Sequence, residues 1–446
     1  MIQMRGRLRH LKFIEKISAV FLCKIVSAGA GLLLTLLLTT NVSAEIYGEY
    51  AYFLGWGSLI AILATSGHDI SLLRSIPISI DKKDWSEFRG LLRYIGAWLV
   101  LISPAIAVIF AASVFFVISP SNSPVKHTVI VALVAVSFAG KSIVSTIFRS
   151  LKSPLLAELF QGAIPSIVTL ALIAIWIVFR DRLDGFPVAT GAIIGITVAT
   201  TMVCLLVAVS LIGRILPAQS KGALPASNFK RWWFKAVPHL FLSGCSVVLM
   251  KIDIVFLGAS VEFSSVAKYQ VAIKIAGTLT LVHHSITHVF APMIAEMYHS
   301  KNMQTLQGYL RSASLMMFVI TSFAAVILAL FGSSILGLFG ANYADAYGVL
   351  LTIMCGVLIN AFCGPVGYVA TMTGHTRLAA TYIGAAAALN IILNAVLIPW
   401  YGLLGAASAT AISAAFWNIG LAISMKKLTG LNTTAISLLA ARKTVR

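Results

Sequence analysis

Long apolar runs recur along the whole chain, and they limit what it can fold into more than any other feature. Hydrophobic residues make up 59% of the 446 residues, and charged residues make up only 11%. A helix that crosses a bilayer needs about 20 mostly apolar residues. Many of the runs reach that length, and nothing between them is long enough for a soluble catalytic domain. The sequence therefore predicts an all-α, polytopic membrane protein.

Twelve of these runs are long enough to be transmembrane helices. We place them at residues 17–39, 47–66, 91–118, 127–148, 155–179, 187–212, 236–258, 264–290, 313–335, 346–372, 378–399 and 403–425. The apolar part of the last segment, residues 431–441, is too short to cross a bilayer. An even number of crossings puts both ends of the chain on the same side of the membrane.

The distribution of lysine and arginine gives this topology a direction. With the N-terminus inside, 25 of the 33 basic residues fall in cytoplasmic segments, and only Lys126, Arg180 and Arg182 fall in outer loops. Cytoplasmic loops of membrane proteins carry this excess of positive charge. We therefore predict that both termini are cytoplasmic. The net charge of +19 is interpreted as a topology signal, and no nucleic-acid partner is expected.

The basic segment 213–235 divides the chain into two halves. We expect an N-terminal six-helix lobe at 1–212, a cytoplasmic linker at 213–235, a C-terminal six-helix lobe at 236–427 and a cytoplasmic tail at 428–446. The halves look alike, since YGEYAYF at 47–53 follows the first span and VAKYQVA at 266–272 follows the seventh. Six spans per half indicate a parallel repeat with its substrate site between the lobes.

Five lysines lie inside the predicted spans: Lys24, Lys141, Lys251, Lys268 and Lys274. A charged side chain in hydrocarbon is costly, so it normally faces the protein interior or a wet cavity. At 1.5 Å rise per residue, Lys251 lies about 22 Å from the inner end of its span and Lys274 about 15 Å from the outer end of its own. A cationic interior with few acids indicates an anionic substrate, whereas Lys268 is interpreted as an interfacial lysine.

Asp253 is the one clear acid deep in a span. It follows Lys251 by two residues, and this spacing points the two side chains to different sides of a helix. Asp253 could pair with a lysine on another span, or it could be a protonatable group that couples transport to an ion. Both alternatives are open at this point.

Motifs for catalysis and for metal binding are missing from the chain. It has no GxSxG, HExxH or phosphate-binding loop, so an enzyme is not expected. His283, His284 and His288 cluster in one span, but no thiol or carboxylate joins them at ligand spacing. We expect neither a metal site nor a cofactor.

Several segments resemble a known family. LNIILNAVLIPWYGLLGAASATAIS at 389–413 resembles the signature of the last two spans of Wzx-type polysaccharide flippases, which belong to the multidrug/oligosaccharidyl-lipid/polysaccharide exporter superfamily. SGHDISLLR at 66–74 resembles the family's Gly-x-Asp…Arg pattern, and YGEYAYF resembles the Gly-x-Tyr segment before it. FGANYADAYGVL at 339–350 also fits. The resemblance covers nearly the whole chain.

This resemblance implies a MATE-like fold, in which two six-helix lobes form a V around a central cavity. It implies alternating access that flips an undecaprenyl-diphosphate-linked oligosaccharide, a repeat unit of O-antigen or exopolysaccharide, across the bacterial inner membrane. Cations in the cavity would bind the diphosphate. The partners it implies are membrane lipid, glycosyltransferases inside and a polysaccharide polymerase outside. The candidate substrate-binding residues are Lys24, Arg74, Lys141, Arg149, Lys251, Gln270 and Lys274, with Asp253 as the coupling candidate.

Other functions fit the sequence less well. A cation-coupled multidrug exporter of the same fold is the main alternative, although such exporters typically use several interior acids. Lipid II flippases of the superfamily usually carry two further spans. A membrane enzyme such as a polymerase would need a large outer loop with catalytic arginines, whereas the outer loops here are short. A purely structural scaffold would leave the buried lysines unexplained.

Overall fold

The computed structural model describes most of the chain. The described residues are 2–118, 124–179, 190–220, 222–281, 283, 286–287, 294, 296–298 and 300–435, with the side chains of 2–18, 117, 118 and 218 outside the description. Within these ranges every regular element is a helix. Several residues named above therefore lie outside the described part: Arg180, Arg182, His284, His288 and residues 436–446.

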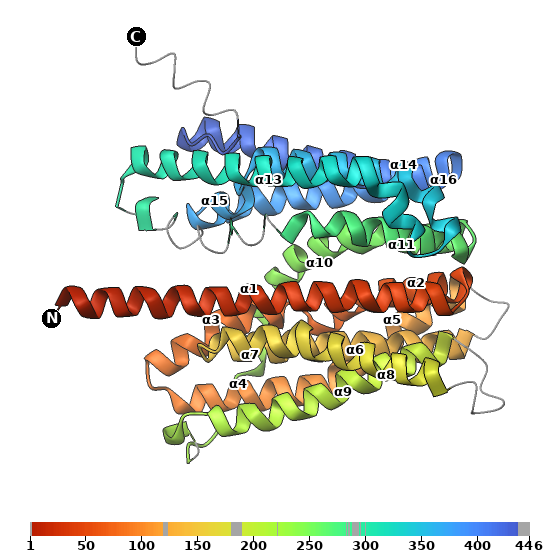
Figure 1. Ribbon diagram of the computed structural model, residues 1–446. Coiled ribbons are helices and arrows are strands. Elements are labelled where there is room, and N and C mark those ends of the chain that lie inside the picture. The colour runs from red at the N-terminus through yellow and green to blue at the C-terminus, as the bar shows by residue number, and fades with distance from the viewer. Residues whose placement is uncertain are drawn as a thin grey trace, which may run out of the picture. The chain divides into compact units, whose positions relative to one another are not determined.

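The described chain divides into two compact units (Figure 1). One unit comprises residues 1–42 and 49–247, and the other comprises residues 43–48 and 248–446. The division falls inside helix α10 (Phe229–Ser260) and not in the basic segment 213–235. The reason is that this segment packs on the first unit. Arg89 donates a hydrogen bond of 2.9 Å to the carbonyl of Ala223, and Trp232 donates one of 2.7 Å to the carboxylate of Glu87.

The first unit is built from helices that follow the predicted spans closely. Its elements are α1 (Ile2–Asn41), α2 (Ala44–Thr65), α3 (His68–Asp81), α4 (Trp85–Ala97), the π-helix η1 (Trp98–Ile102), α5 (Ser103–Ile118), α6 (Pro124–Ser150), α7 (Pro154–Glu158), the π-helix η2 (Leu159–Ala163), α8 (Ile164–Phe179), α9 (Thr190–Ile215), the 3-10 helix η4 (Ala218–Ser220) and the beginning of α10. Its core contains Ile76, Phe88, Ile143 and Phe148, all fully buried between α3, α4 and α6.

Helix α3 is an element that the sequence did not predict. Residues 67–81 lie between the predicted spans 47–66 and 91–118, and Ser71, Arg74 and Pro77 interrupt the apolar pattern there. The helix forms because it packs on α4 and α6. It is bent by 41° from α2, and the break lies at Ser66 and Gly67, which have φ values of 48° and 78°. A β-carbon on Gly67 would lie 2.3 Å from the carbonyl oxygen of Ala236, so both the turn and the packing require glycine there.

The second unit continues from α10 through the C-terminal helices. Its elements are α11 (Phe263–Thr278), α13 (Met303–Gly337), the 3-10 helix η5 (Ala341–Ala346), α14 (Tyr347–Cys363), α15 (Val366–Met372) and α16 (Thr376–Thr429). The 54 residues of α16 would span about 80 Å if straight, far more than a bilayer. Gly402 breaks the helix with φ 52° and ψ −125°. Tyr382 and Ser424 then meet at 2.8 Å, so the two halves run antiparallel.

The described residues after α16 fold back onto the second unit. Gln307 on α13 holds the backbone of Asn432 with two hydrogen bonds, one to its carbonyl and one from its N–H, both of 2.8 Å. Ser314 donates a hydrogen bond to the carbonyl of Thr433, and the N–H of Ala435 donates one of 2.9 Å to the carbonyl of Phe362. We call residues 430–435 the C-terminal strap. The strap is thus packed structure at the start of the segment expected to be a cytoplasmic tail.

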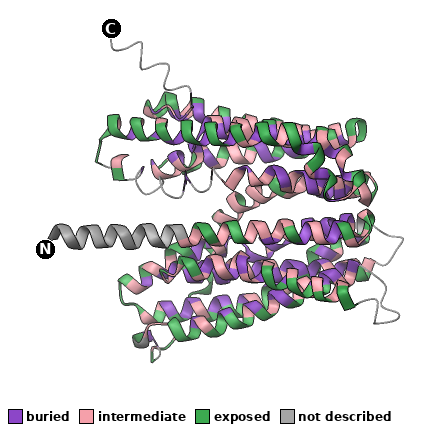
Figure 2. Cartoon of the chain, in the orientation of Figure 1, coloured by how far each residue is buried: buried purple, intermediate pink, exposed green. Residues whose placement is uncertain are grey.

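Exposed residues occur along the helices of both units (Figure 2), and many of them are large and apolar. Val100, Leu206 and Leu330 are each more than 70% exposed on helices that are apolar enough to cross a bilayer. Large exposed apolar areas of this kind are typical of surfaces that contact lipid. In the described part of the chain nine helices meet the length and hydropathy of a membrane span, and the bent pair α2–α3 would make ten. The molecule is a multi-pass membrane protein, whereas the count of twelve spans and the side of the termini stay predictions.

Candidate functional site

A buried carboxylate forms the centre of the second unit. Asp253 on α10 is 1% exposed, although it lies in the middle of an apolar helix. Tyr269 on α11 donates a hydrogen bond of 2.9 Å to its Oδ2, and Asn394 on α16 donates one of 2.7 Å to its Oδ1. Thr410, on the far half of α16, donates a further hydrogen bond to Oδ2. Three helical segments therefore converge on one acid, and we call this group the Asp253 centre.

Helix α16, which contacts this carboxylate, carries further buried polar atoms. Neither polar atom of the Asn390 amide, nor Oδ1 of Asn394, nor the hydroxyl of Ser413 has a hydrogen-bond partner among the described residues. Unpaired buried polar atoms are unfavourable unless water or an ion completes them. Carboxylate, amide and hydroxyl oxygens are the ligands preferred by hard cations. The Asp253 centre therefore has the chemistry to hold a small cation, or to carry a proton on the carboxylate.

The hydrogen bonds bear on the alternatives left open above. These three bonds between described residues and Asp253 all come from neutral side chains. Dipoles therefore hold the carboxylate, and both the lysine pairing and the coupling role of Asp253 stay predictions. The sequence identified Asp253 but missed Asn390, Asn394 and Thr410. The four-residue spacing of the two asparagines, on one helix face, was a readable signal.

The deep lysines of the second unit lie beside this centre. Lys251 and Lys274 are half-buried on α10 and α11, and they are close enough to interact electrostatically with each other. Lys251 also interacts electrostatically with Asp253. Gln270, one turn before Lys274, has a buried Oε1 without a hydrogen-bond partner among the described residues. These three sequence candidates are thus gathered in one region, whereas Lys268 forms an ion pair of 2.7 Å with the exposed Asp345.

The two units share a tyrosine–threonine pair. The hydroxyls of Tyr50 and Thr197 lie 3.4 Å apart in the first unit, and those of Tyr269 and Thr410 lie 3.4 Å apart in the second. The first pair joins α2 to α9, and the second joins α11 to α16. This geometry supports the internal repeat inferred from YGEYAYF and VAKYQVA.

The acid, however, is present in one unit only. The helices before the two tyrosines both end nine residues earlier, at Asn41 before Tyr50 and at Ser260 before Tyr269. By this register the position sixteen residues before the tyrosine is Leu34 in the first unit and Asp253 in the second. Leu34 is buried and apolar. The repeat therefore supplies the same scaffold twice but the buried charge once.

The remaining candidates lie in the first unit and are not gathered at one point. Lys24 is half-buried on α1, and Lys141 is half-buried on α6, with its Nζ 4.9 Å from the centre of the Phe138 ring. Arg149, at the end of α6, forms an ion pair of 3.0 Å with Glu158. Arg149 also donates a hydrogen bond to Gln161. Its charge is therefore held by the adjacent α7 and η2.

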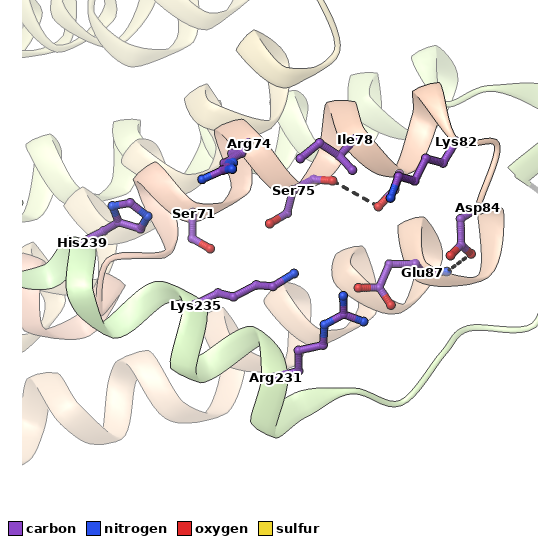
Figure 3. Close-up of a pocket in the computed structure, with 11 residues that line it drawn as sticks. Ser71, Arg74, Ser75, Ile78, Lys82, Asp84, Glu87, Arg231, Lys235 and His239 are labelled. Carbon is purple, nitrogen blue, oxygen red and sulfur yellow. Dashed lines mark hydrogen bonds between the residues drawn. The ribbon is translucent and has the colours of Figure 1, made fainter. Parts of the chain in front are cut away.

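Arg74 lines a pocket of about 380 Å³ within the first unit (Figure 3). The pocket lies between α3, the start of α4 and the start of α10. The lining residues with charged or titratable side chains are Arg74, Lys82, Asp84, Glu87, Arg231, Lys235 and His239. We call this the α3–α10 pocket. The sequence singled out Arg74, whereas the cations of RWWFK at 231–235 fall in the segment predicted to be a cytoplasmic linker.

The model of a protein family described as polysaccharide biosynthesis protein matches residues 13–298. This range covers more than half of the chain, including the first unit and the helix that bears Asp253. The chain belongs to this family. Among curated proteins, no relative matches the chain.

Solved structures of the multidrug/oligosaccharidyl-lipid/polysaccharide exporter (MOP) superfamily share the fold of this family member. An inward-facing multidrug resistance MATE transporter matches 94% of the chain and 96% of its own, with a TM-score of 0.69 and 14% identity. The lipid II flippase MurJ matches 91% and 87%, with a TM-score of 0.64 and 14% identity. A superfamily transporter from Pyrococcus furiosus, described by the reverse polarity of its binding pocket, matches 93% and 96%, with a TM-score of 0.61 and 14% identity. The recognition of a polysaccharide biosynthesis family and of a MATE-like fold from the sequence is thus confirmed.

Proposed function

We propose that this protein flips an undecaprenyl-diphosphate-linked oligosaccharide across the bacterial inner membrane during the synthesis of O-antigen or exopolysaccharide. The observation that carries the proposal is the pair of half-buried lysines, Lys251 and Lys274, inside apolar spans of the second unit. Two cations close together in such a region repel each other and are costly to desolvate. An anionic group between them removes both penalties, and a diphosphate carries such charge. Membership in a polysaccharide biosynthesis family supports this choice of anion.

The residues contribute binding and charge, and the reaction needs no covalent step. Lysine ammonium groups would bind the diphosphate by charge-assisted hydrogen bonds. The buried amide oxygen of Gln270 can accept a hydrogen bond from a sugar hydroxyl next to them. The polyprenyl tail stays in the bilayer, where its transfer has no cost. Flipping then requires only that the polar head be accepted from one leaflet and released to the other.

The Asp253 centre would couple this movement to an ion. A buried acid that loads a cation or a proton changes its charge, and the change alters how strongly Lys251 is attracted to it. The coupling ion would then be transported in each cycle and would not be a permanently bound cofactor. The same centre supports a second candidate function, cation-coupled multidrug export, and two structural neighbours are described as multidrug resistance MATE family transporters.

The proposal is tested in a strain that lacks the gene, complemented with wild type, Lys251→Gln or Lys274→Gln. Lys268→Gln is the matched control, because this lysine lies in the same unit and pairs with the exposed Asp345. Surface polysaccharide and the leaflet distribution of lipid-linked intermediates are measured. We expect intermediates stranded on the inner leaflet in the deletion strain and in both test variants, and rescue by wild type and by the control.

Two results would overturn the proposal. Normal polysaccharide in the deletion strain, together with new sensitivity to cationic drugs, would favour the multidrug exporter. Full rescue by Lys251→Gln and Lys274→Gln would remove the cationic site as the basis of the function. The abundance of each variant in the membrane is measured in parallel, so that loss of protein is not mistaken for loss of transport.

A further inference from the structure

The α3–α10 pocket of the first unit is cationic, and its helices present charge in ordered rows. Arg231, Lys235 and His239 follow one another at intervals of four on α10, so they share one face of that helix. On α3 the same interval relates Ser71, Ser75 and Ser79. Figure 3 shows Lys235 and Arg231 reaching from α10 toward α3 and the start of α4. Guanidinium, ammonium and hydroxyl groups therefore converge on one cavity.

The carboxylates around this cavity are already engaged. Asp84 caps α4 by accepting a hydrogen bond of 2.9 Å from the N–H of Glu87. The carboxylate of Glu87 accepts hydrogen bonds from Trp232, at 2.7 Å, and from Asn228, at 3.0 Å. Asp69 lies near His239, at the other end of the row.

The cations of the cavity, in contrast, are not paired with carboxylates in the described part of the chain. No described carboxylate forms an ion pair with any of the four: Arg74, Lys82, Arg231 and Lys235. Four positive groups thus face two carboxylates that hold α4 and the segment 213–235 together. An anion would complete the cavity.

Exposed apolar side chains on α3 and α10, two helices that line the cavity, indicate what the anion is attached to. Ile78 is exposed and lines it, and Leu73 is exposed on the same helix. Phe234, next to Lys235, is 63% exposed, and Phe241 is 60% exposed two turns further along α10. A soluble phosphate would gain no binding energy from these apolar side chains. Aromatic and aliphatic groups beside cations are typical of the headgroup region of a membrane.

We propose that the α3–α10 pocket is a binding site for the phosphate-bearing headgroup of a membrane lipid. Guanidinium and ammonium groups match phosphate oxygens in charge and in hydrogen bonding. A cavity of 380 Å³ falls within the size range of pockets that hold small ligands. The basic-residue distribution predicts that this end of the unit faces the cytoplasm, where anionic headgroups are concentrated. The inference depends on the proposed flipping function only if the lipid is the polyprenyl diphosphate carrier.

The experiment uses the purified full-length protein in detergent micelles and native mass spectrometry. The probes are undecaprenyl diphosphate, phosphatidylglycerol and inorganic pyrophosphate. Wild type is compared with the double variant Arg74→Gln, Lys235→Gln. The matched control is Arg93→Gln, Lys230→Gln, which removes the same charge from two exposed residues outside the pocket.

We expect the pocket variant to weaken lipid binding at least about tenfold, which corresponds to about 1.4 kcal/mol, and the control to leave it within about twofold. Loss of both lipids supports a general site for lipid phosphate, and loss of undecaprenyl diphosphate alone supports a site for the carrier. Equal weakening in the pocket variant and the control would overturn the proposal. Pyrophosphate binding as strong as lipid binding would overturn the assignment to a lipid.

Two controls distinguish a loss of lipid binding from a loss of folding or of transport. The melting temperature of each variant is measured, and Arg231→Gln serves as a second pocket variant if the double variant is unstable. Arg231 is exposed, and no described residue forms an ion pair with it, so its removal costs the fold little. The readout is binding in vitro. The lipid-binding proposal can therefore fail while Lys251 and Lys274 remain essential for surface polysaccharide. It can also hold if those two lysines are dispensable.

Discussion

The hydroxyl of Tyr269 lies 2.9 Å from Oδ2 of Asp253 and donates a hydrogen bond to it. This bond joins α11 to α10 at a side chain that is 1% exposed. Hydrogen bonds to ionised groups contribute about 1.5–3 kcal/mol, more than bonds between neutral groups. The geometry around Asp253 is therefore well determined, and its charge can be altered with little change of shape.

The substitution Asp253→Asn tests whether this charge is needed. Asparagine has the shape of aspartate but cannot bind a cation electrostatically or take up a proton. We expect surface polysaccharide to accumulate at least about tenfold more slowly, the size expected when an interaction of about 1.4 kcal/mol in the cycle is lost. Asp345→Asn is the control, because Asp345 is 71% exposed and its surface ion pair contributes little. Wild-type accumulation in the Asp253→Asn strain would show that the centre is structural.

The tyrosine–threonine pairs allow a symmetric comparison. Tyr269→Phe removes a hydrogen bond to a carboxylate, whereas Tyr50→Phe removes the contact with the neutral hydroxyl of Thr197. We expect Tyr269→Phe to slow polysaccharide accumulation several-fold and Tyr50→Phe to leave it near wild type. The same complementation assay measures both. Equal effects would mean that the pairs act as structural joints in both units and that the bond to Asp253 adds nothing.

The turn between α2 and α3 should depend on glycine. Gly67→Ala places a β-carbon 2.3 Å from the carbonyl of Ala236 and strains a residue with φ 78°. We expect it to lower the stability of the protein by about 1–3 kcal/mol. Gly96→Ala is the control, because no heavy atom lies within 4 Å of its β-carbon position inside α4. Thermal unfolding of the purified variants measures the effect, and an unchanged midpoint for Gly67→Ala would contradict the packing described.

The C-terminal strap should detach when its anchor is removed. Gln307→Ala eliminates both hydrogen bonds to the backbone of Asn432, each with a contribution of about 0.5–1.5 kcal/mol. We expect faster amide hydrogen exchange across residues 430–435, because these amides would open locally. Gln304→Ala, an exposed residue one turn earlier on α13, is the control. If the amides of residues 430–435 stay protected from exchange in the Gln307→Ala variant, the burial of Leu431 would be what keeps the strap in place.

The sequence predicted those parts of the fold that depend on one segment at a time. The helix break at Gly402 falls between the predicted spans 378–399 and 403–425, since apolar runs and turn residues are local signals. Helix α3 was missed, because its polar residues and Pro77 give no apolar period and its stability comes from packing on α6. The pairing of Arg149 with Glu158 was also missed, because a short turn brings α7 back against α6.

The candidate site shows the same limit. Asp253 was identifiable because a carboxylate inside an apolar helix is rare and costly. Its partners were not identifiable, because the rotation of α16 about its axis decides whether Asn394 or a neighbour faces the acid. The cations at 231–235 were visible as charge beside aromatics. Only the packing of α10 on α3 places two of them in a cavity with Arg74.

The repeat has a consequence for the history of the chain. Two identical halves would have carried either two acids or none at the positions now held by Leu34 and Asp253. The charge was therefore gained or lost after the halves diverged, while the hydroxyl pairs of Tyr50 and Tyr269 kept their spacing. The tyrosine–threonine contact thus occurs in both units, whereas the buried charge occurs at this position in only one. A repeat of this kind allows the residue at one position to change while the contact that both units share is kept.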